Sequence, residues 1–242
     1  MEHGEYERLA AAEERMWWFR GLHANLLAAL ARAAPRPRVV LDAGCGTGGL
    51  LARLAAALPG ALVLGIDIDG TAAALARDKS RQPICRGSVD RLPFADKCLD
   101  AVLSADVLCH RGVDERAALA GFHRCLKPGG TLVLNLPAYP WLYSAHDVAV
   151  DNARRYRRSE VRRLLAEAGF ARVRLAYWNT FLFPLMVLRR KLGGRGAASD
   201  VALLPAPAER VFGAVMALEN RLLRAGIRLP FGGSILATAV KP

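Results

Sequence analysis

Residues 38–50 read RVVLDAGCGTGGL, and this stretch decides the fold that the rest of the sequence is expected to adopt. Residues 39–41 are apolar, and two of them are β-branched valines, which suits a strand that is covered on both faces. The glycines that follow Asp42 permit a sharp turn and the close approach of a ligand. An Ala/Leu-rich helical pattern begins at Leu50. The stretch therefore predicts a buried strand, a glycine loop and the start of a helix.

A second apolar run, residues 61–66, ends at Asp67. A strand, a helix and a second strand fit between Asp42 and Asp67, so both acids are expected at the carboxyl ends of neighbouring parallel strands. A carboxylate at that edge can accept hydrogen bonds from both ribose hydroxyls of a nucleoside. A solvated acid at a strand end is the alternative for Asp67 taken by itself.

The string LDAGCGTG, in which an acid precedes the first glycine, resembles motif I of the class I S-adenosylmethionine-dependent methyltransferases. KPGG at 127–130, expected as a tight turn before a strand at 131–136, is a second match. WWF at 17–19 and YPWLYSAHD at 139–147 are similar to strings of a bacterial subgroup, the methyltransferase type 11/12-like proteins. The resemblance implies a doubly wound, Rossmann-like α/β sheet of seven strands in the order 3-2-1-4-5-7-6, with strand 7 antiparallel.

The same resemblance implies S-adenosylmethionine as the cofactor and S-adenosylhomocysteine as its product. The residues expected to bind this cofactor are Asp42, Ala43, Gly44, Cys45, Gly46, Gly48, Asp67, Ile68, Ser88, Val89, Ser104, Arg20 and Trp18. Ser88 stands where the family usually has an acid for the adenine amino group, so its hydroxyl, the Val89 backbone or an inward-turned Asp90 is expected to replace that acid. For the WWF cluster, core packing is the alternative to a lid over the cofactor, with Arg20 available for a carboxylate.

Two histidines are candidates for a general base, because the pKa of histidine lies near neutral pH. His110 follows the fourth expected strand, 101–104, where a satisfied polar cap is the alternative. His146 could be oriented by the adjacent Asp147. Asn152 stands where the subgroup has a further histidine, which argues against a mechanism that needs two.

The segment after the fifth strand is expected to meet the acceptor. The predicted substrate-binding residues are Tyr139, Trp141, Tyr143, Arg154, Arg155 and Tyr156. Ordinary loop packing is the alternative for the aromatic residues. For the arginines the choice lies between phosphate binding by guanidinium groups and a solvated helix face with one or two buried ion pairs.

The 242 residues carry a net charge of +12, with a pI near 10.2. Such a charge attracts nucleic acid or anionic lipid, but a base-composition bias toward arginine explains it equally well. The five cysteines form no C-x-x-C pair and no metal site is expected, which favours a reducing cytoplasm. The longest apolar run, 177–188, is shorter than the roughly 18 residues of a membrane span, so we expect a cytoplasmic protein with peripheral membrane contact as an open alternative.

We expect three parts: an N-terminal helical cover (1–37), a cofactor-binding core (38–178 and 231–242) and a helical insertion (179–230). The expected reaction is an in-line attack of an acceptor oxygen, nitrogen or carbon on the sulfonium methyl group. A small-molecule or lipid-linked acceptor is favoured. RNA or DNA is disfavoured because residues 104–110 lack an N-P-P-Y-like string, and a non-catalytic S-adenosylmethionine-binding module is the third alternative.

Overall fold

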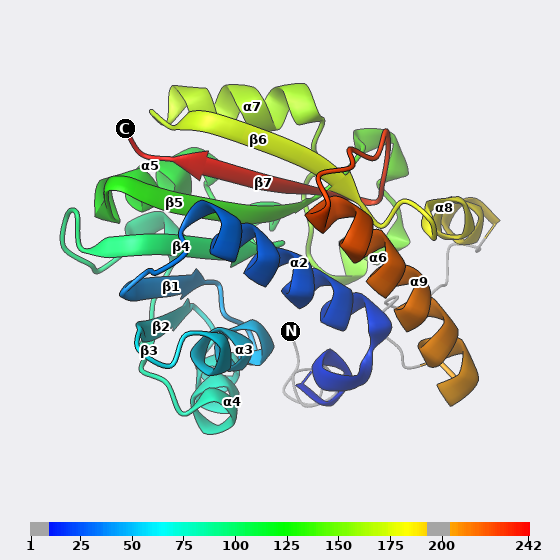
Figure 1. Cartoon of the computed structure of the whole chain (residues 1–242), viewed down its shortest axis with the longest axis horizontal. Coiled ribbons are helices and arrows are strands. Elements are labelled where there is room, and N and C mark those ends of the chain that lie inside the picture. Colours follow the sequence, from blue (N-terminus) through cyan, green and yellow to red (C-terminus); the bar gives the residue numbers. More distant parts are fainter. Residues whose placement is uncertain (1–9, 193–203) are drawn as a thin grey trace.

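The computed structural model describes residues 10–192 and 204–242. Its centre is one seven-stranded sheet in the order β3-β2-β1-β4-β5-β7-β6 (Figure 1). The strands are β1 (Val39–Ala43), β2 (Leu62–Asp67), β3 (Ile84–Arg86), β4 (Leu99–Ala105), β5 (Leu126–Pro137), β6 (Ala171–Trp178) and β7 (Ser234–Val240). The pairs from β3 to β5 are parallel, and β7 runs antiparallel to both β5 and β6. The predicted fold class and strand order are confirmed.

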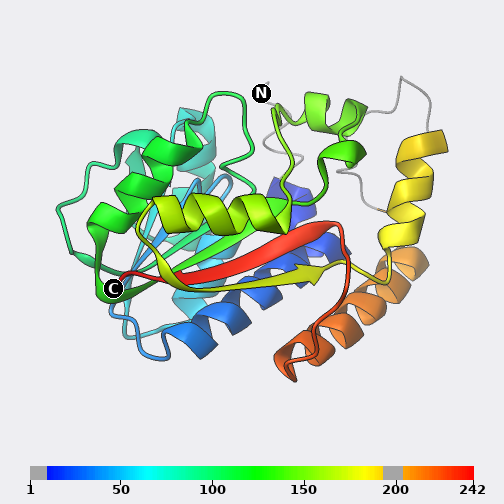
Figure 2. The ribbon, with the colours of Figure 1, turned by 90° about the horizontal axis from the view of Figure 1, so that it is seen from above.

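Helices cover both faces of this sheet (Figures 1 and 2). The α-helices are α2 (Trp17–Ala33), α3 (Gly49–Ala57), α4 (Gly70–Ser80), α5 (Glu115–Cys125), α6 (Ala145–Ala149), α7 (Arg158–Glu167), α8 (Phe183–Leu192) and α9 (Ala206–Arg224), and η1 (Val89–Arg91) and η2 (Pro140–Leu142) are short 3₁₀ turns. Leucines of α2 and α3 share one apolar core with Trp178 and with Met216 of α9. Phe122 of α5 and Leu165 of α7 belong to the core on the opposite face. The N-terminal helix and the insertion thus cover the same face.

The pattern of residues 5–34 predicts one long helix or two, and the structure has two helical pieces. Residues 10–15 are helical, and the backbone of Met16 is extended (ψ 129°) immediately before α2 begins. Residues 5–9 of that prediction lie outside the described part of the chain. The break lets the two helical pieces run in different directions, so that residues 10–15 reach the glycine loop while α2 crosses the sheet.

The turn expected at residues 127–130 lies within β5, which begins at Leu126. Leu126 pairs with Leu99 of β4, and the register shifts before the next pair, Ala101 with Thr131. Gly129 takes a left-handed φ of 79°, which bends the strand without removing it from the sheet. The prediction of a turn followed by a strand at 131–136 was therefore wrong in its boundary.

Gly48 is a position in the loop where a side chain would cost much stability. Its φ is 85°, and a Cβ atom there would lie 2.7 Å from the backbone Cα of Ala76 in α4. We expect Gly48→Ala to lower the free energy of unfolding by about 2–5 kcal/mol, measured by urea denaturation. Gly46→Ala is the matched control, because φ is 51° there but no atom lies within 4 Å, so about 1–2 kcal/mol is expected. Equal losses in the two variants would contradict this account.

In the described residues, no helix is both long enough and apolar enough to span a bilayer.

Candidate functional site

The glycine loop leaves β1 at the carboxyl edge of the sheet and is held there by β2 and by the β4–α5 loop. The backbone N–H groups of Gly44 and Cys45 both donate to the Ile66 carbonyl, at 2.8 and 3.0 Å. A Cβ atom on Gly44 would lie 2.3 Å from Val107, whereas one on Gly46 would meet no atom of the described residues within 4 Å. The loop is thus packed on one side and open on the other, as a ligand requires.

Asp67 joins the end of β2 to this loop. Its Oδ2 accepts a hydrogen bond from the Gly46 backbone at 2.8 Å, and its Oδ1 accepts one from the Asp69 backbone at 3.0 Å. Burial raises the pKa of Asp67, and the hydrogen bonds from Asp69 and Gly46 oppose that rise. Each carboxylate oxygen has a further lone pair, so the group can hold the loop and still accept hydrogen bonds from ligand hydroxyls.

The surroundings of the Asp42 carboxylate show whether the loop fits a cofactor that carries hydrogen-bond donors. The residue is 1% exposed, and its Oδ2 has no hydrogen-bond partner in the described part of the chain. Burial raises its pKa well above the ordinary value, and the negative charges of Glu13 and Asp67 add to that effect. A buried oxygen without a partner beside an open glycine loop fits a positively charged, donor-bearing ligand.

Glu13 belongs to this site, although no sequence signal pointed to it. Its Oε2 accepts hydrogen bonds from the Thr47 hydroxyl (2.6 Å), the Gly49 backbone (3.0 Å) and the Lys79 ammonium group (3.1 Å). Lys79 also donates to the Ala10 carbonyl at 3.1 Å. The first described helical turns are therefore fastened to the start of α3 and to α4. An acid in an amphipathic helix does not reveal partners so far along the chain.

Four other predicted cofactor residues lie along the same edge of the sheet. Ser104 is buried and donates to the Ala43 carbonyl at 2.8 Å. Ser88 accepts a hydrogen bond from the Asp90 backbone at 3.2 Å and caps η1, while Val89 is buried. Ile68 is 67% exposed at the rim. Asp90, the alternative to Ser88, accepts a hydrogen bond through Oδ2 from the Asp114 backbone at the start of α5.

The aromatic cluster at residues 17–19 packs against the insertion. Trp18 stacks on Trp178 of β6 with ring centroids 6.0 Å apart, and the Trp17 ring contacts Phe212 of α9 edge to face. The Trp17 backbone donates to Glu209 at 2.8 Å. These contacts favour the core-packing interpretation of the cluster. Arg20 is exposed on α2, and its proposed role toward a carboxylate stays a prediction.

The two candidate histidines lie in different segments, one in the turn after β4 and one in α6. His110 closes a turn with Val107 and forms an isolated bridge with Asn152; its charge acts on Asp67 and lowers the pKa of that residue. His146 is the second residue of α6. Asp147 is fully buried, and its carboxylate accepts hydrogen bonds from Arg155, from Asn152 and from the Ser144 backbone.

Arg155 and Asp147 form a buried ion pair with a 2.8 Å contact, and the Arg155 side chain is only 3% exposed. Arg155 also donates to the Ala138 carbonyl at 3.0 Å, and Arg190 of α8 lies 3.6 Å from Asp147. Burial opposes ionisation of Asp147, but the hydrogen bond and charge of Arg155, aided by Arg190, outweigh it and lower the pKa. The Arg155–Asp147 pair connects two parts of the loop after β5, and Arg190 connects Asp147 to α8.

The neighbouring residues are engaged in a similar way. The Tyr156 hydroxyl contacts the Leu108 carbonyl (2.8 Å) and Glu115 (2.6 Å), and Arg154 lies 3.5 Å from the same glutamate. The Tyr143 hydroxyl donates to the Asn152 carbonyl at 2.8 Å. Among the alternatives for the arginines, these contacts favour a buried ion pair for Arg155 and a partly exposed one for Arg154.

Aromatic rings form a wall beside this loop. Tyr139 stacks on Tyr177 of β6 with centroids 5.4 Å apart, and it contacts Trp141 and Phe183 at 5.7 and 5.5 Å. Phe183 of α8 in turn contacts Phe231 at 5.5 Å. We name these five residues the aromatic wall. It lies between the core and the insertion, and Trp141 is half exposed there.

Asp106 and Asn135 are two polar residues that the sequence did not identify as candidates. Asp106 follows β4 with a left-handed φ of 54°. Its Oδ2 accepts a hydrogen bond from the Asn135 amide at 2.8 Å, and the same amide accepts one from the Trp178 indole at 2.6 Å. Two features of the sequence could have identified them: Asn135 is a polar residue inside the apolar strand 131–137, and Asp106 comes just after another buried strand.

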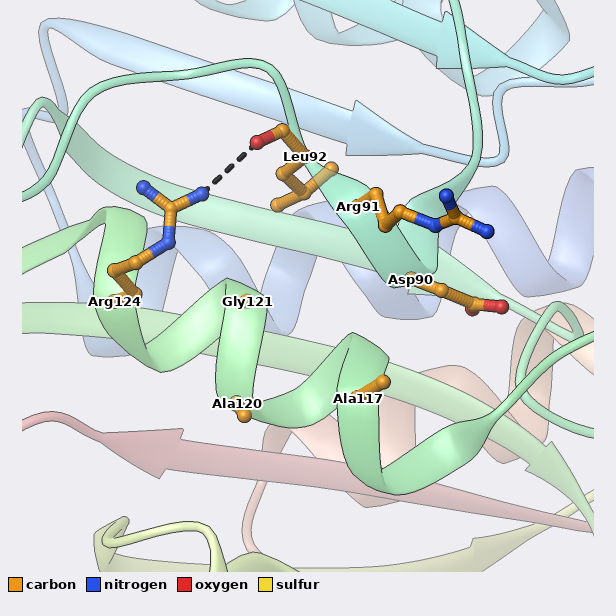
Figure 3. A pocket seen from close by; sticks show the side chains of 7 residues that line it. All are labelled: Asp90, Arg91, Leu92, Ala117, Ala120, Gly121 and Arg124. Atoms are coloured by element: carbon orange, nitrogen blue, oxygen red, sulfur yellow. Dashed lines mark hydrogen bonds between the residues drawn. The ribbon is translucent and has the colours of Figure 1, made fainter.

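A shallow surface hollow of about 350 Å³ lies elsewhere, between η1 and α5 (Figure 3). Its residues are Asp90, Arg91, Leu92, Ala117, Ala120, Gly121 and Arg124. Arg124 donates to the Leu92 carbonyl at 2.9 Å across the hollow, which fastens η1 to α5. None of the glycine-loop residues lines it, so we assign it no part in the site. In the described residues, no cluster of three or more His, Cys, Asp or Glu side chains could hold a metal ion.

Comparison with known proteins places the glycine loop in a known domain. Residues 41–134 match the family described as a methyltransferase domain. The chain is 34% identical over 130 residues to malonyl-acyl-carrier-protein O-methyltransferase of Herminiimonas arsenicoxydans, which covers 54% of this chain and 48% of that protein. It is 36% identical over 102 residues to demethylmenaquinone methyltransferase of Chlorobaculum parvum, covering 42% of each. The chain thus spans half or less of the length of these curated relatives.

The fold is shared over almost the whole chain with solved structures. The crystal structure of an S-adenosylmethionine-dependent methyltransferase from Thermotoga maritima superposes with a TM-score of 0.64 at 20% identity, covering 99% of this chain and 95% of the other.

Proposed function

We propose that this chain, whose residues 41–134 are a methyltransferase domain within the class I S-adenosylmethionine-dependent fold, transfers a methyl group to a small-molecule or lipid-linked acceptor. One observation carries the proposal: an open glycine loop lies between the Asp67 carboxylate and the buried Oδ2 of Asp42, which has no hydrogen-bond partner among the described residues. Such an edge suits a ligand that brings hydroxyl groups and positive charge.

The charges of this edge fit S-adenosylmethionine. The cofactor itself carries two positive groups, a sulfonium and an ammonium, and one negative carboxylate. When bound, it supplies an activated methyl group. Asp67 would accept hydrogen bonds from the ribose hydroxyls, and Asp42 would accept from the ammonium group. The Gly44–Gly46 turn would allow the close approach of the ligand to the backbone.

The aromatic wall supports an acceptor with an apolar part. Its rings belong to the loop after β5, to β6, to α8 and to the segment before β7, so that the core and the insertion meet there. Burial, aided by the hydrogen bond with Tyr177, raises the pKa of Tyr139 to about 12, so its hydroxyl stays protonated at neutral pH. The wall can therefore pack against apolar groups and still offer a polar contact.

A lipid-linked acceptor is further supported by the outer face of α8. Leu185 and Leu188 of α8, and Phe181 just before the helix, recur at helical spacing and are 49%, 54% and 44% exposed, and Arg189 lies beside them. Apolar side chains next to cations suit contact with an anionic membrane surface.

We expect a Leu185→Glu/Leu188→Glu variant to lose at least ten-fold in binding to phosphatidylglycerol vesicles, measured by co-sedimentation, because two charges would enter the interface. Vesicles of phosphatidylcholine should bind the parent protein weakly. Leu62→Glu is the matched control, since Leu62 is 50% exposed at the opposite end of the sheet. Equal vesicle binding by all three proteins would remove the membrane surface from the proposal.

The methyl-transfer proposal itself is tested in two steps. Calorimetry should detect binding of S-adenosylmethionine and S-adenosylhomocysteine to the full chain, and no binding would refute the proposal. Incubation with methyl-labelled donor and separate lipid, small-molecule and RNA fractions should then label the lipid or small-molecule fraction. Label found only in RNA would favour a nucleic-acid acceptor, the alternative that the net charge of +12 suggests. Binding without transfer to any fraction would favour a non-catalytic module.

A further inference from the structure

Asp106 lies where the cofactor edge and the acceptor side meet. The next residue, Val107, packs against Gly44 of the glycine loop. The Asp106 backbone donates to the Asn135 carbonyl at the end of β5, at 3.0 Å. A carboxylate in this position lies between the loop that would hold the methyl donor and the strand that leads to the aromatic wall.

The backbone of Asp106 is held in a conformation that few side chains adopt. Its φ of 54° is left-handed, which non-glycine residues take only where the surroundings impose it. The Cys109 thiol contacts its carbonyl oxygen at 3.1 Å and also contacts Asn152 at 3.1 Å. The turn after β4 is thus fixed from both sides, and it directs one acidic side chain into the edge of the sheet.

The two oxygens of this carboxylate have different surroundings. Oδ2 accepts the 2.8 Å hydrogen bond from Asn135, whose amide is oriented by the Trp178 indole. Oδ1 accepts no hydrogen bond from the described part of the chain, and Asp106 remains partly exposed. One oxygen is therefore positioned, and the other is available to a ligand.

Burial brings the pKa of Asp106 close to physiological pH. Burial raises the pKa of Asp106 to about 7, against the lowering effects of the Asn135 hydrogen bond and the Arg155 charge, while Asp147 adds to the rise. The nearby Cys109 thiol stays protonated, because burial raises its pKa further. A carboxylate with such a pKa can exchange a proton at working pH.

We propose that Asp106 is the catalytic base of this site and that the acceptor therefore presents an O–H or N–H group to its free oxygen. This inference rests on the proposed methyl transfer. The acceptor heteroatom uses a lone pair to form the bond to the methyl carbon, and the electron pair of the broken S–CH₃ bond stays on sulfur. The proton of the acceptor passes to Asp106 Oδ1, and the resulting carboxylic acid releases it to water. Asn135 acts as a positioning residue.

The test compares Asp106→Asn with the parent protein. Asparagine has the same shape and tolerates left-handed φ, so the fold is retained. Asp151→Asn is the matched control, because Asp151 also has a left-handed φ (57°) but is exposed in a loop. Calorimetry with S-adenosylhomocysteine should give the same affinity for all three proteins, within about three-fold.

Transfer from labelled donor into the small-molecule and lipid fractions is then followed from pH 5.5 to 8.5. The parent rate should rise with pH around a midpoint near 7, as the base loses its proton. Asp106→Asn should lose roughly 10²–10⁴-fold and show no such rise. Retention of more than a third of the parent rate by Asp106→Asn, or label found on a carbon atom only, would overturn the inference.

A readout without turnover separates this inference from the methyl-transfer proposal. The Trp178 indole N–H shares the Asn135 amide with Asp106, so its NMR chemical shift should titrate near pH 7 in the parent and in Asp151→Asn. The titration should be absent in Asp106→Asn. A parent resonance that stays constant from pH 5.5 to 8.5 would overturn the role of Asp106 even if methyl transfer occurs. Failure to bind either form of the cofactor would instead refute the proposed function.

Discussion

Asp67→Ala is expected to weaken the binding of S-adenosylhomocysteine by about 100-fold in calorimetry. Two hydrogen bonds from ribose hydroxyls to a carboxylate contribute about 3 kcal/mol together, and each 1.4 kcal/mol corresponds to a ten-fold change in affinity. The substitution also removes the acceptor for the Gly46 backbone, which lies 2.8 Å from Asp67 Oδ2. The loop then loses one of the contacts that hold its open side in place.

The pH dependence of this binding follows from the raised pKa of Asp67. Ribose recognition needs the ionised group, so the affinity of the parent protein should begin to fall at a higher pH than an ordinary aspartate would give. Asp78→Ala, an exposed acid on α4, is the control and should bind as the parent does. An Asp67→Ala variant with parental affinity would exclude Asp67 from the cofactor site.

Arg155→Ala should lower the free energy of unfolding by about 3–5 kcal/mol, because it leaves the fully buried Asp147 without its closest cation. Arg190, 3.6 Å away, compensates only in part. Since the folded-state pKa of Asp147 lies below its ordinary value, the pair stabilises the parent protein at neutral pH. That contribution disappears as the pH falls through the lowered pKa. Urea denaturation at pH 7 and at pH 3 measures both effects.

Arg163→Ala is the matched control for this variant. Arg163 is 61% exposed and lies 3.7 Å from Glu167, so the loss should be at most about 0.5 kcal/mol. The double variant Arg155→Met/Asp147→Asn removes both charges of the buried pair together, and we expect it to be more stable than Arg155→Ala. A loss below about 1 kcal/mol for Arg155→Ala would show that the loop is held by other contacts.

The core of the fold was predictable because its signals are local. Residues 39–43 form a buried strand, the glycines turn the backbone, and right-handed crossovers then restrict the arrangement of the parallel strands. The start of β5 was misplaced because Gly129 bends the strand, whereas KPGG reads as a turn. The break at Met16 was left open, since a single extended residue has no distinct sequence signal.

The candidate site was predictable only where residues follow a strand end. Asp42 and Asp67 could be placed on one edge from the strand pattern, but the contact between Glu13 and Gly49 depends on how a separate helix packs. For the arginines of the loop at 139–156, acceptor binding and buried ion pairs were both open from the sequence. Arg155 is buried against Asp147, a pairing that depends on loop closure and not on spacing. Asp106 also follows a strand end, but its pairing with Asn135 could not be predicted, because Asn135 lies on another strand.

The position of β7 between β5 and β6 determines when this site can exist during synthesis. The ribosome makes β6 before α8, α9 and β7, yet in the described sheet β6 pairs only with β7. Trp178, at the end of β6, therefore reaches the Asn135 amide only after β7 has been made and inserted. Until then the nascent chain exposes two unpaired strand edges of the kind that chaperones bind. The glycine loop is among the first parts of the site to be made, whereas the aromatic wall, which includes Phe231 just before β7, is completed last.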